Sequence, residues 1–138
     1  MSFKFGKNQL APIAGAAYTV LVRVIARGTL NDFVTNRVAR AQQAVVKTHL
    51  DAWHERAIKA GWKSSAELKS QFGTASILSA ERVVFNIKGN DYRLVVLIDY
   101  YYQGVLVLWL GTHAEYDKID AREVKYDKKR YRSPADSN

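Results

Sequence analysis

The sequence predicts an α+β fold, a small single domain in which helices pack on one face of a mostly antiparallel sheet. The predicted helices precede a meander of three strands separated by tight-turn residues, and the longest helix shows helical spacing of its apolar residues. At 138 residues the chain has the length of one domain and not of two. We therefore expect the order β–α–α–α–β–β–β, followed by a short helical turn.

The first expected element is a strand over residues 20–26, which are β-branched and apolar. Gly28 interrupts this pattern. A helix is expected to begin near Leu30, because Thr29, or less well Asn31, offers a side-chain oxygen that caps helix N-termini.

A longer helix is predicted over residues 40–59, and Gly61 is the residue expected to end it in the left-handed conformation. Steps of four, three and four place four apolar side chains on one face of this helix. These are Val46, Leu50, Trp53 and Ala57.

The pair Ser64 and Glu67 has the spacing of a capping box, which predicts a short helix through Gln71 that ends at Gly73. Three strands joined by two turns are expected next, with a final helical turn over residues 113–119. The strands are predicted over residues 82–88, 92–101 and 105–112, with turns at 89–91 and 103–104.

The charge of the chain favours a polyanionic partner. Lys and Arg total 21 against 13 Asp and Glu, a formal charge of +8, and nucleic acid is the leading candidate. The absence of cysteine excludes a disulfide framework, a thiolate metal site and a cysteine nucleophile. Three scattered histidines do not make a zinc set, so we expect neither metal nor cofactor.

We expect residues 20–121 to form the domain, with a loosely ordered extension over 1–19 and a fraying basic tail over 122–138. Residues 10–22 superficially resemble a secretory signal, which leaves a secreted basic protein as a rival class. Pro12 dilutes that apolar run and Arg23 interrupts it before it reaches membrane-spanning length.

A basic turn between two strands is the first candidate site. Lys88 and Arg93 flank the turn that contains Asn90, and a lysine and an arginine so placed can hold a phosphate. The alternative is a surface arginine whose stem covers the sheet edge, paired with Asp99 on the same face of the strand.

A second cluster follows the last strand. His113 can exchange a proton near neutral pH, Tyr116 lies on the same side if the segment is helical, and Lys118 adds charge for a phosphate. The alternative is an exposed capping segment in which Asp117 and Lys118 are merely solvated.

Aromatic residues are the third signal. Tyr100, Tyr101 and Tyr102 flank the second turn with Trp109, and aromatic rings beside basic residues suit unstacked RNA bases. Strand aromatics are more often packed, so we interpret Trp109 and one face of the tyrosine run as core. Trp53 and Trp62 are interpreted as core too, and His49 and His54 as solvated or partly buried helix residues.

Two phrases together resemble a known family. Residues 82–96, RVVFNIKGNDYRLVV, followed by residues 111–118, GTHAEYDK, are similar to the HigB toxins of type II toxin–antitoxin systems. These belong to the RelE-like group of mRNA interferases. The resemblance spans about residues 22–124.

The resemblance implies a compact RelE-like fold and a metal-independent endoribonuclease, in which the ribose 2′-OH attacks the adjacent phosphate. Its arginine motif falls on Arg93, which would stabilise charge on phosphorus with help from Lys88. Its His-x-x-Tyr-Asp motif falls on His113, the general acid or base, on Tyr116, which would stack on a base or bond the phosphate, and on Asp117, which would orient His113 or cap a turn. Lys88, Asn90, Asp117 and Lys118 are the residues expected to bind RNA or phosphate.

The resemblance also implies partners. The chain would be a cytoplasmic toxin that cleaves mRNA, on the translating ribosome in many relatives, and so inhibits translation. A HigA-like helix-turn-helix antitoxin would restrain it and carry the complex to operator DNA, with no role for a membrane. A non-catalytic nucleic-acid-binding module remains the alternative, because it explains the charge and the aromatics equally well.

Overall fold

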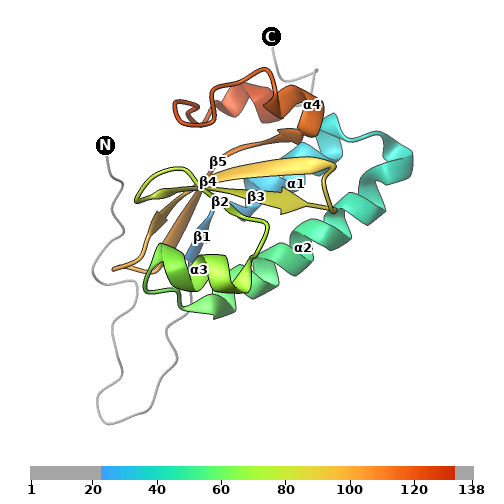
Figure 1. The fold of residues 1–138 in the computed structure, drawn as a ribbon. Helices are drawn as coiled ribbons and strands as arrows, with labels where there is room; N and C mark the ends of the chain where they lie inside the picture. The colour runs from blue at the N-terminus through green and yellow to red at the C-terminus, as the bar shows by residue number, and fades with distance from the viewer. Residues whose placement is uncertain (1–22, 133–138) are drawn as a thin grey trace.

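The computed structural model describes residues 23–132, which form a single five-stranded sheet with helices against it (Figure 1). The strand order is β1-β5-β4-β3-β2, and every neighbouring pair is antiparallel except β1 with β5. The predicted α+β class is therefore confirmed. The expected extension, the signal-like run and the first three residues of the first strand lie outside the described residues.

The first strand is confirmed as β1 (Arg23–Ile25), and α1 (Arg27–Arg37) follows it at once. The predicted helix start near Leu30 is wrong, since the N-cap is Ala26, which makes no side-chain capping bond. Thr29 lies buried inside the first turn, where its N–H donates to the carbonyl of Ala26 at 3.1 Å. The chain turns into the helix directly from the strand, and Gly28 falls in the first turn of that helix.

The long helix is confirmed as α2 (Gln43–Ala60), preceded by a 3₁₀ turn, η2 (Arg40–Gln42). Its four predicted core side chains are all buried: Val46, Leu50, Trp53 and Ala57. Gly61 ends the helix with φ of +61°, as the sequence predicts.

The capping pair of α3 (Ser65–Gln71) is confirmed in part. The hydroxyl of Ser64 accepts the N–H of Glu67 at 3.2 Å, but the Glu67 carboxylate accepts from the N–H of Lys63 and not from that of Ser64. A two-residue strand, β2 (Ser76–Ile77), then pairs with Val83 and Val84, and its brevity explains why no alternating pattern reveals it.

The three predicted long strands are confirmed as β3 (Arg82–Ile87), β4 (Tyr92–Asp99) and β5 (Gly104–Thr112). β4 ends two residues earlier than predicted, because the Asp99 carboxylate accepts the N–H groups of Tyr101 and Tyr102 and so forms the turn. Gln103, and not Gly104, takes the left-handed conformation there, with φ of +57°.

Each face of the sheet carries its own core. The first core lies under α1, α2 and α3 and includes Phe33, Trp53, Trp62 and Phe85. The second core lies on the opposite face, centred on Val84, Val95, Leu108 and Trp109. The predicted packing of helices on one face is thus met by α1–α3, and the tryptophans predicted as core are buried. Tyr101 is exposed, whereas Tyr100 packs in part against the first core.

A C-terminal segment covers the second core. It begins with α4 (His113–Tyr116), contributes Tyr116, Ile119 and Val124 to that core, and ends in the 3₁₀ turn η3 (Lys128–Tyr131). Figure 1 shows it on the side of the sheet opposite α2 and α3.

The expectation that the chain frays after residue 121 is wrong as far as Arg132. Tyr131 is buried in the first core, where its hydroxyl accepts the N–H of Leu110 at 3.1 Å and its carbonyl accepts from Asn36 at 2.7 Å. The burial of Tyr131 was not predicted, because its neighbours in sequence are largely charged and one aromatic residue makes no periodic pattern. The remaining tail, residues 133–138, lies outside the described part of the chain.

Gly111 in β5 is expected to be intolerant of any side chain. A Cβ at this position would lie 2.3 Å from Cη2 of Trp109 and 2.5 Å from Nη2 of Arg130. Because both neighbours are packed, Gly111→Ala should lower the free energy of unfolding by about 1–3 kcal/mol in urea denaturation.

Gly73→Ala is the matched control for Gly111→Ala. Nothing lies within 4 Å of a Cβ built on Gly73, so its effect should stay within about 0.5 kcal/mol. Equal stability of the two variants would contradict the tight packing of Trp109 and Arg130 on Gly111.

Candidate functional site

Strand register aligns three residues across one end of the second sheet face. Asn86 of β3 pairs with Arg93 of β4, and Arg93 pairs with Gly111 of β5. Their neighbours Val84, Val95 and Trp109 belong to the second core, so these residues continue that face toward the turn between β3 and β4. Arg93 therefore lies opposite Gly111, two positions before His113 in the chain.

The guanidinium of Arg93 is held by neutral groups. Its Nη2 donates to Oδ1 of Asn90 at 2.6 Å, and its Nη1 donates to the carbonyls of Asn90 and Tyr92 at 3.0 and 3.2 Å. The same guanidinium lies 5.8 Å from the ring centre of Tyr116. Among residues 23–132 no carboxylate pairs with it, so its positive charge stays available to an anion.

The alternative pairing of Arg93 with Asp99 is wrong. Asp99 lies at the far end of β4, opposite Gly104, and its carboxylate is bound by the backbone of the following turn. Alternation placed both residues on one face correctly, but six residues of strand keep them apart.

A capping box fixes the start of α4. The hydroxyl of Thr112 accepts the N–H of Glu115 at 3.1 Å, and the carboxylate of Glu115 accepts the N–H of Thr112 at 3.0 Å. The N–H of His113 donates to the carbonyl of Asp91 at 2.9 Å, which ties this helix to the basic turn. The two clusters predicted separately from the sequence therefore lie at the same end of the sheet.

His113 has a carboxylate partner on one ring nitrogen. Its Nδ1 lies 3.1 Å from Oδ2 of Asp117, and both side chains are about half exposed. A hydrogen bond at Nδ1 fixes the tautomer and leaves Nε2 to meet a substrate. Asp117 and Lys118 are exposed, as the interpretation of an exposed capping segment expects. The imidazole of His113, by contrast, is oriented by its contact with Asp117.

Glu115 joins three segments that are far apart in the chain. Its carboxylate lies 2.8 Å from Nη2 of Arg37 in α1 and 3.2 Å from Nη2 of Arg130 near the C-terminus. Burial raises the pKa of this carboxyl, but the Thr112 N–H and the two guanidinium groups outweigh burial and lower the pKa to about 2.

Arg130 packs against Trp109, the residue on which Tyr116 also packs. Its guanidinium lies 4.6 Å from the ring centre of Trp109 and donates to the carbonyl of Leu110 at 3.0 and 3.2 Å. Tyr116 also packs against Trp109, with ring centres 6.1 Å apart. Tyr116, which lies next to Arg93, is thus supported by a residue 14 positions later in the chain.

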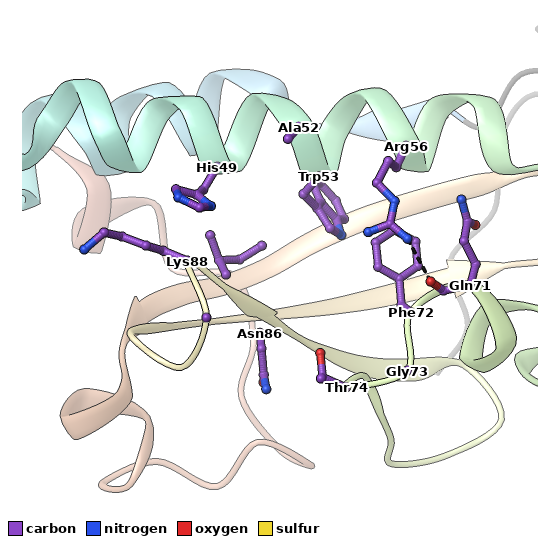
Figure 2. Close-up of a pocket in the computed structure, with 12 residues that line it drawn as sticks. His49, Ala52, Trp53, Arg56, Gln71, Phe72, Gly73, Thr74, Asn86 and Lys88 are labelled. Carbon is purple, nitrogen blue, oxygen red and sulfur yellow. Dashed lines mark hydrogen bonds between the residues drawn. The ribbon is translucent and has the colours of Figure 1, made fainter.

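Lys88 lies on the other side of the turn from Arg93. Its Nζ pairs with Oδ2 of Asp91 at 2.9 Å, and this bond raises the pKa of Lys88 and lowers that of Asp91. Lys88 lines a cavity under α2 together with His49, as Figure 2 shows. The structure therefore brings together Asn90, Arg93, His113, Tyr116 and Asp117, and sets Lys88 apart from them.

Four residues near the site were missed from the sequence: Arg37, Asn86, Glu115 and Arg130. Only Asn86 has a visible signal, because it is the one polar residue inside an apolar strand. Arg37 and Arg130 come from α1 and the C-terminal segment, so sequence spacing could not place them here.

The ion pairs of Glu115 are expected to make stability depend on pH. The folded pKa of about 2 lies below the ordinary 4.5, so the native state binds fewer protons than the unfolded state between these values. The stabilisation is complete above pH 4.5 and is lost as the pH falls to about 2. Because the carboxylate is one third exposed, we expect Glu115→Gln to cost only about 1 kcal/mol at pH 7.

Urea denaturation of wild type and Glu115→Gln at pH 7 and near pH 2 would measure this difference, and it should vanish at the lower pH. Glu123→Gln, at an exposed position on the same segment, should show no such convergence. A constant difference across the range would remove the ion pairs as its cause.

Within residues 23–132 no group of three or more His, Cys, Asp or Glu side chains is arranged to hold a metal ion. None of the helices described there is long and apolar enough to cross a membrane.

Comparison with protein families links this geometry to a known group. The family model HigB_toxin, described as the RelE-like toxic component of a toxin–antitoxin system, matches residues 46–119. The match covers more than half of the chain and contains every candidate site residue from Lys88 to Lys118. None of the curated proteins matches the chain. The chain therefore belongs to the HigB toxin family, the RelE-like toxic components of toxin–antitoxin systems.

Proposed function

We propose that this toxin is an endoribonuclease that cleaves mRNA on the translating ribosome and so inhibits translation. The observation that supports it is the guanidinium of Arg93, held by the neutral groups of Asn90 and Tyr92 beside Tyr116 and the His113–Asp117 pair. A cation without a carboxylate partner next to an oriented imidazole suits a phosphodiester whose reaction needs charge stabilisation and proton transfer.

In the proposed reaction the ribose 2′-oxygen forms a bond to phosphorus as the bond from phosphorus to the 5′-oxygen breaks. The products are a 2′,3′-cyclic phosphate and a free 5′-hydroxyl. Arg93 binds the nonbridging phosphate oxygens, where negative charge increases in the transition state. All atoms of this step come from the RNA, and the proton lost by the 2′-OH is balanced by the proton that the departing 5′-oxygen gains.

His113 transfers the proton. With Nδ1 bonded to Asp117, the neutral ring presents its Nε2 lone pair, which can take the proton of the 2′-OH. The protonated ring can equally donate to the departing 5′-oxygen. Asp117 acts as the positioning residue.

Tyr116 has a ring fixed between Trp109 and Arg93, and we propose that it stacks on a base or that its hydroxyl bonds the phosphate. Asn90 positions Arg93, while Lys88 and Lys118 bind RNA nearby. The net charge of +8 would draw the protein to ribosomal RNA and make binding salt-dependent.

Product ends provide the test. Purified protein is incubated with end-labelled mRNA, free and in programmed ribosomes, and we expect cleavage with 2′,3′-cyclic phosphate and 5′-hydroxyl ends. Ends that carry a 5′-phosphate would overturn the proposed reaction. RNA binding without cleavage under both conditions would favour the alternative of a non-catalytic nucleic-acid-binding module.

Membership in the family implies an antitoxin partner. We propose that it is a HigA-like helix-turn-helix protein that carries the complex to operator DNA, and that the toxin acts in the cytoplasm. If so, the neighbouring gene encodes a helix-turn-helix protein of about 100 residues. Co-expression with that protein should suppress toxicity, and persistent toxicity would contradict the pairing.

A further inference from the structure

A cavity separate from the Arg93 site lies beside the basic turn between β3 and β4. It has a volume of about 320 Å³, at the small end of the range for ligand pockets. Residues of α2, of the loop after α3 and of the end of β3 line it (Figure 2). His49 and Lys88 lie at one end, Arg56 and Phe72 at the other, and Trp53 between them.

Trp53, one of the residues that line this cavity, has an unpaired donor. Trp53 is only 4% exposed, and its Nε1–H has no hydrogen-bond partner among residues 23–132. Trp62 shows the usual arrangement, since its Nε1–H donates to Oε1 of Gln71 at 2.7 Å. An unpaired buried N–H costs about 1–3 kcal/mol, so the Trp53 indole favours a ligand with an acceptor oxygen.

The charges around the cavity favour an anion. Arg56 and Lys88 are cations, His49 becomes one when protonated, and none of the described lining residues is Asp or Glu. Among the described residues Lys88 pairs with Asp91 alone, an exposed surface partner that an incoming phosphate can replace at little cost.

One of these charges, Arg56, stacks on an aromatic ring. The guanidinium of Arg56 lies 4.0 Å from the ring centre of Phe72 and is fixed by a bond to the carbonyl of Gln71 at 2.7 Å. Planar guanidinium and aromatic groups are the surfaces on which single-stranded nucleic acids stack their bases.

The cavity adjoins the Arg93 site through one residue. Asn86 lines the cavity and is also the strand partner of Arg93. β2 covers β3 only at Val83 and Val84, so no strand separates Asn86 from the cavity at this edge. The side chain of Asn86 lies on the second sheet face with Arg93, whereas Trp53 belongs to the first core. An RNA strand bound at Arg93 would therefore reach the cavity round the open edge of β3 at Asn86.

We infer that this cavity binds one nucleotide of the RNA next to the cleaved phosphodiester, with its phosphate at Lys88 and His49 and a base oxygen accepting from Trp53 Nε1–H. The inference rests on the proposed ribonuclease function and extends it to a binding site beyond the reacting phosphate. RNA is favoured over an acidic peptide because the cavity is reached from the Arg93 site round the open edge of β3 and contains a stacking surface at Arg56 and Phe72.

The indole N–H signal of Trp53 in NMR spectra tests the inference directly. The probe is a 2′-O-methyl RNA tetranucleotide of mixed sequence, which lacks the 2′-OH and cannot be cleaved. We expect the Trp53 signal, assigned with Trp53→Phe, to move on addition of the tetranucleotide. Inorganic phosphate alone should not move it. A stationary Trp53 signal, or one that only a glutamate-rich peptide moves, would overturn the inference.

His49→Gln gives a second readout, because His49 is exposed and its loss leaves the fold intact. Loss of the contact between His49 and the phosphate should weaken tetranucleotide binding about tenfold. It should raise KM for mRNA cleavage on ribosomes by about the same factor. Lys63→Gln removes one cation from an exposed position outside the cavity and should change neither. Equal effects of the two variants would show that His49 acts only through general charge attraction, and would overturn the inference.

The same assays separate this inference from the proposed function. If the wild type cleaves RNA but the Trp53 signal does not move, only the cavity inference fails. If the wild type cleaves no RNA, free or on ribosomes, the ribonuclease function fails as well.

Discussion

Arg93→Ala is expected to reduce kcat for RNA cleavage by about 10²–10³, the size of effect found when one donor to a developing anion is removed. The structure supplies the reason, since the guanidinium is held by Asn90 and Tyr92 and has no carboxylate partner among the described residues. A charge already neutralised by a carboxylate would stabilise the transition state far less. The rate is to be measured at saturating RNA, so that weaker binding does not enter.

Arg93→Lys should recover only part of the lost rate, because an ammonium group cannot form the bidentate contact of a guanidinium. Arg40→Ala removes the same charge from an exposed position in η2 and should leave kcat unchanged. Thermal unfolding of Arg93→Ala shows whether the variant is folded. An unchanged kcat in the folded variant would exclude Arg93 from transition-state stabilisation.

His113→Ala is expected to lower the cleavage rate by about 10²–10⁴, the usual contribution of a general acid or base. Only the imidazole at this position is both oriented, by the 3.1 Å contact with Asp117, and close to the turn that holds Arg93. Steady-state cleavage of mRNA on ribosomes measures the loss.

Asp117→Asn should have a smaller effect, because the amide can still meet the imidazole but no longer stabilises its protonated form. Its pH–rate profile should shift relative to wild type, a change that a purely structural substitution would not produce. Full cleavage by His113→Ala would remove histidine from the mechanism and leave proton transfer to another group.

Several parts of the fold were predictable because they follow from local pattern. The buried face of α2 comes from the spacing of Val46, Leu50 and Trp53, and its end comes from Gly61. The faces of β4 come from simple alternation, with Leu94 and Val96 in the first core and Val95 in the second. Each of these depends on residues a few positions apart.

The start of α1 and the C-terminal segment were not predictable in this way. The helix begins at Arg27 without a capping side chain, because β1 ends only two residues earlier and sets the position at which the helix can start. Tyr131 is buried although its neighbours are charged, because Asn36 and Leu110, distant in sequence, bind its polar atoms. Tertiary contacts outweigh local propensity at both places.

By itself, the sequence determined the α+β class, most element positions, and the two motifs around Arg93 and His113 whose resemblance pointed to the HigB family. Only the tertiary structure decided that these motifs share one end of the sheet, that Lys88 faces a separate cavity, and that Glu115 joins Arg37 to Arg130. Periodicity records which face a residue takes within its own element. Strand register and the return of the C-terminal segment decide which residues meet, and these arise only when distant parts of the chain pack together.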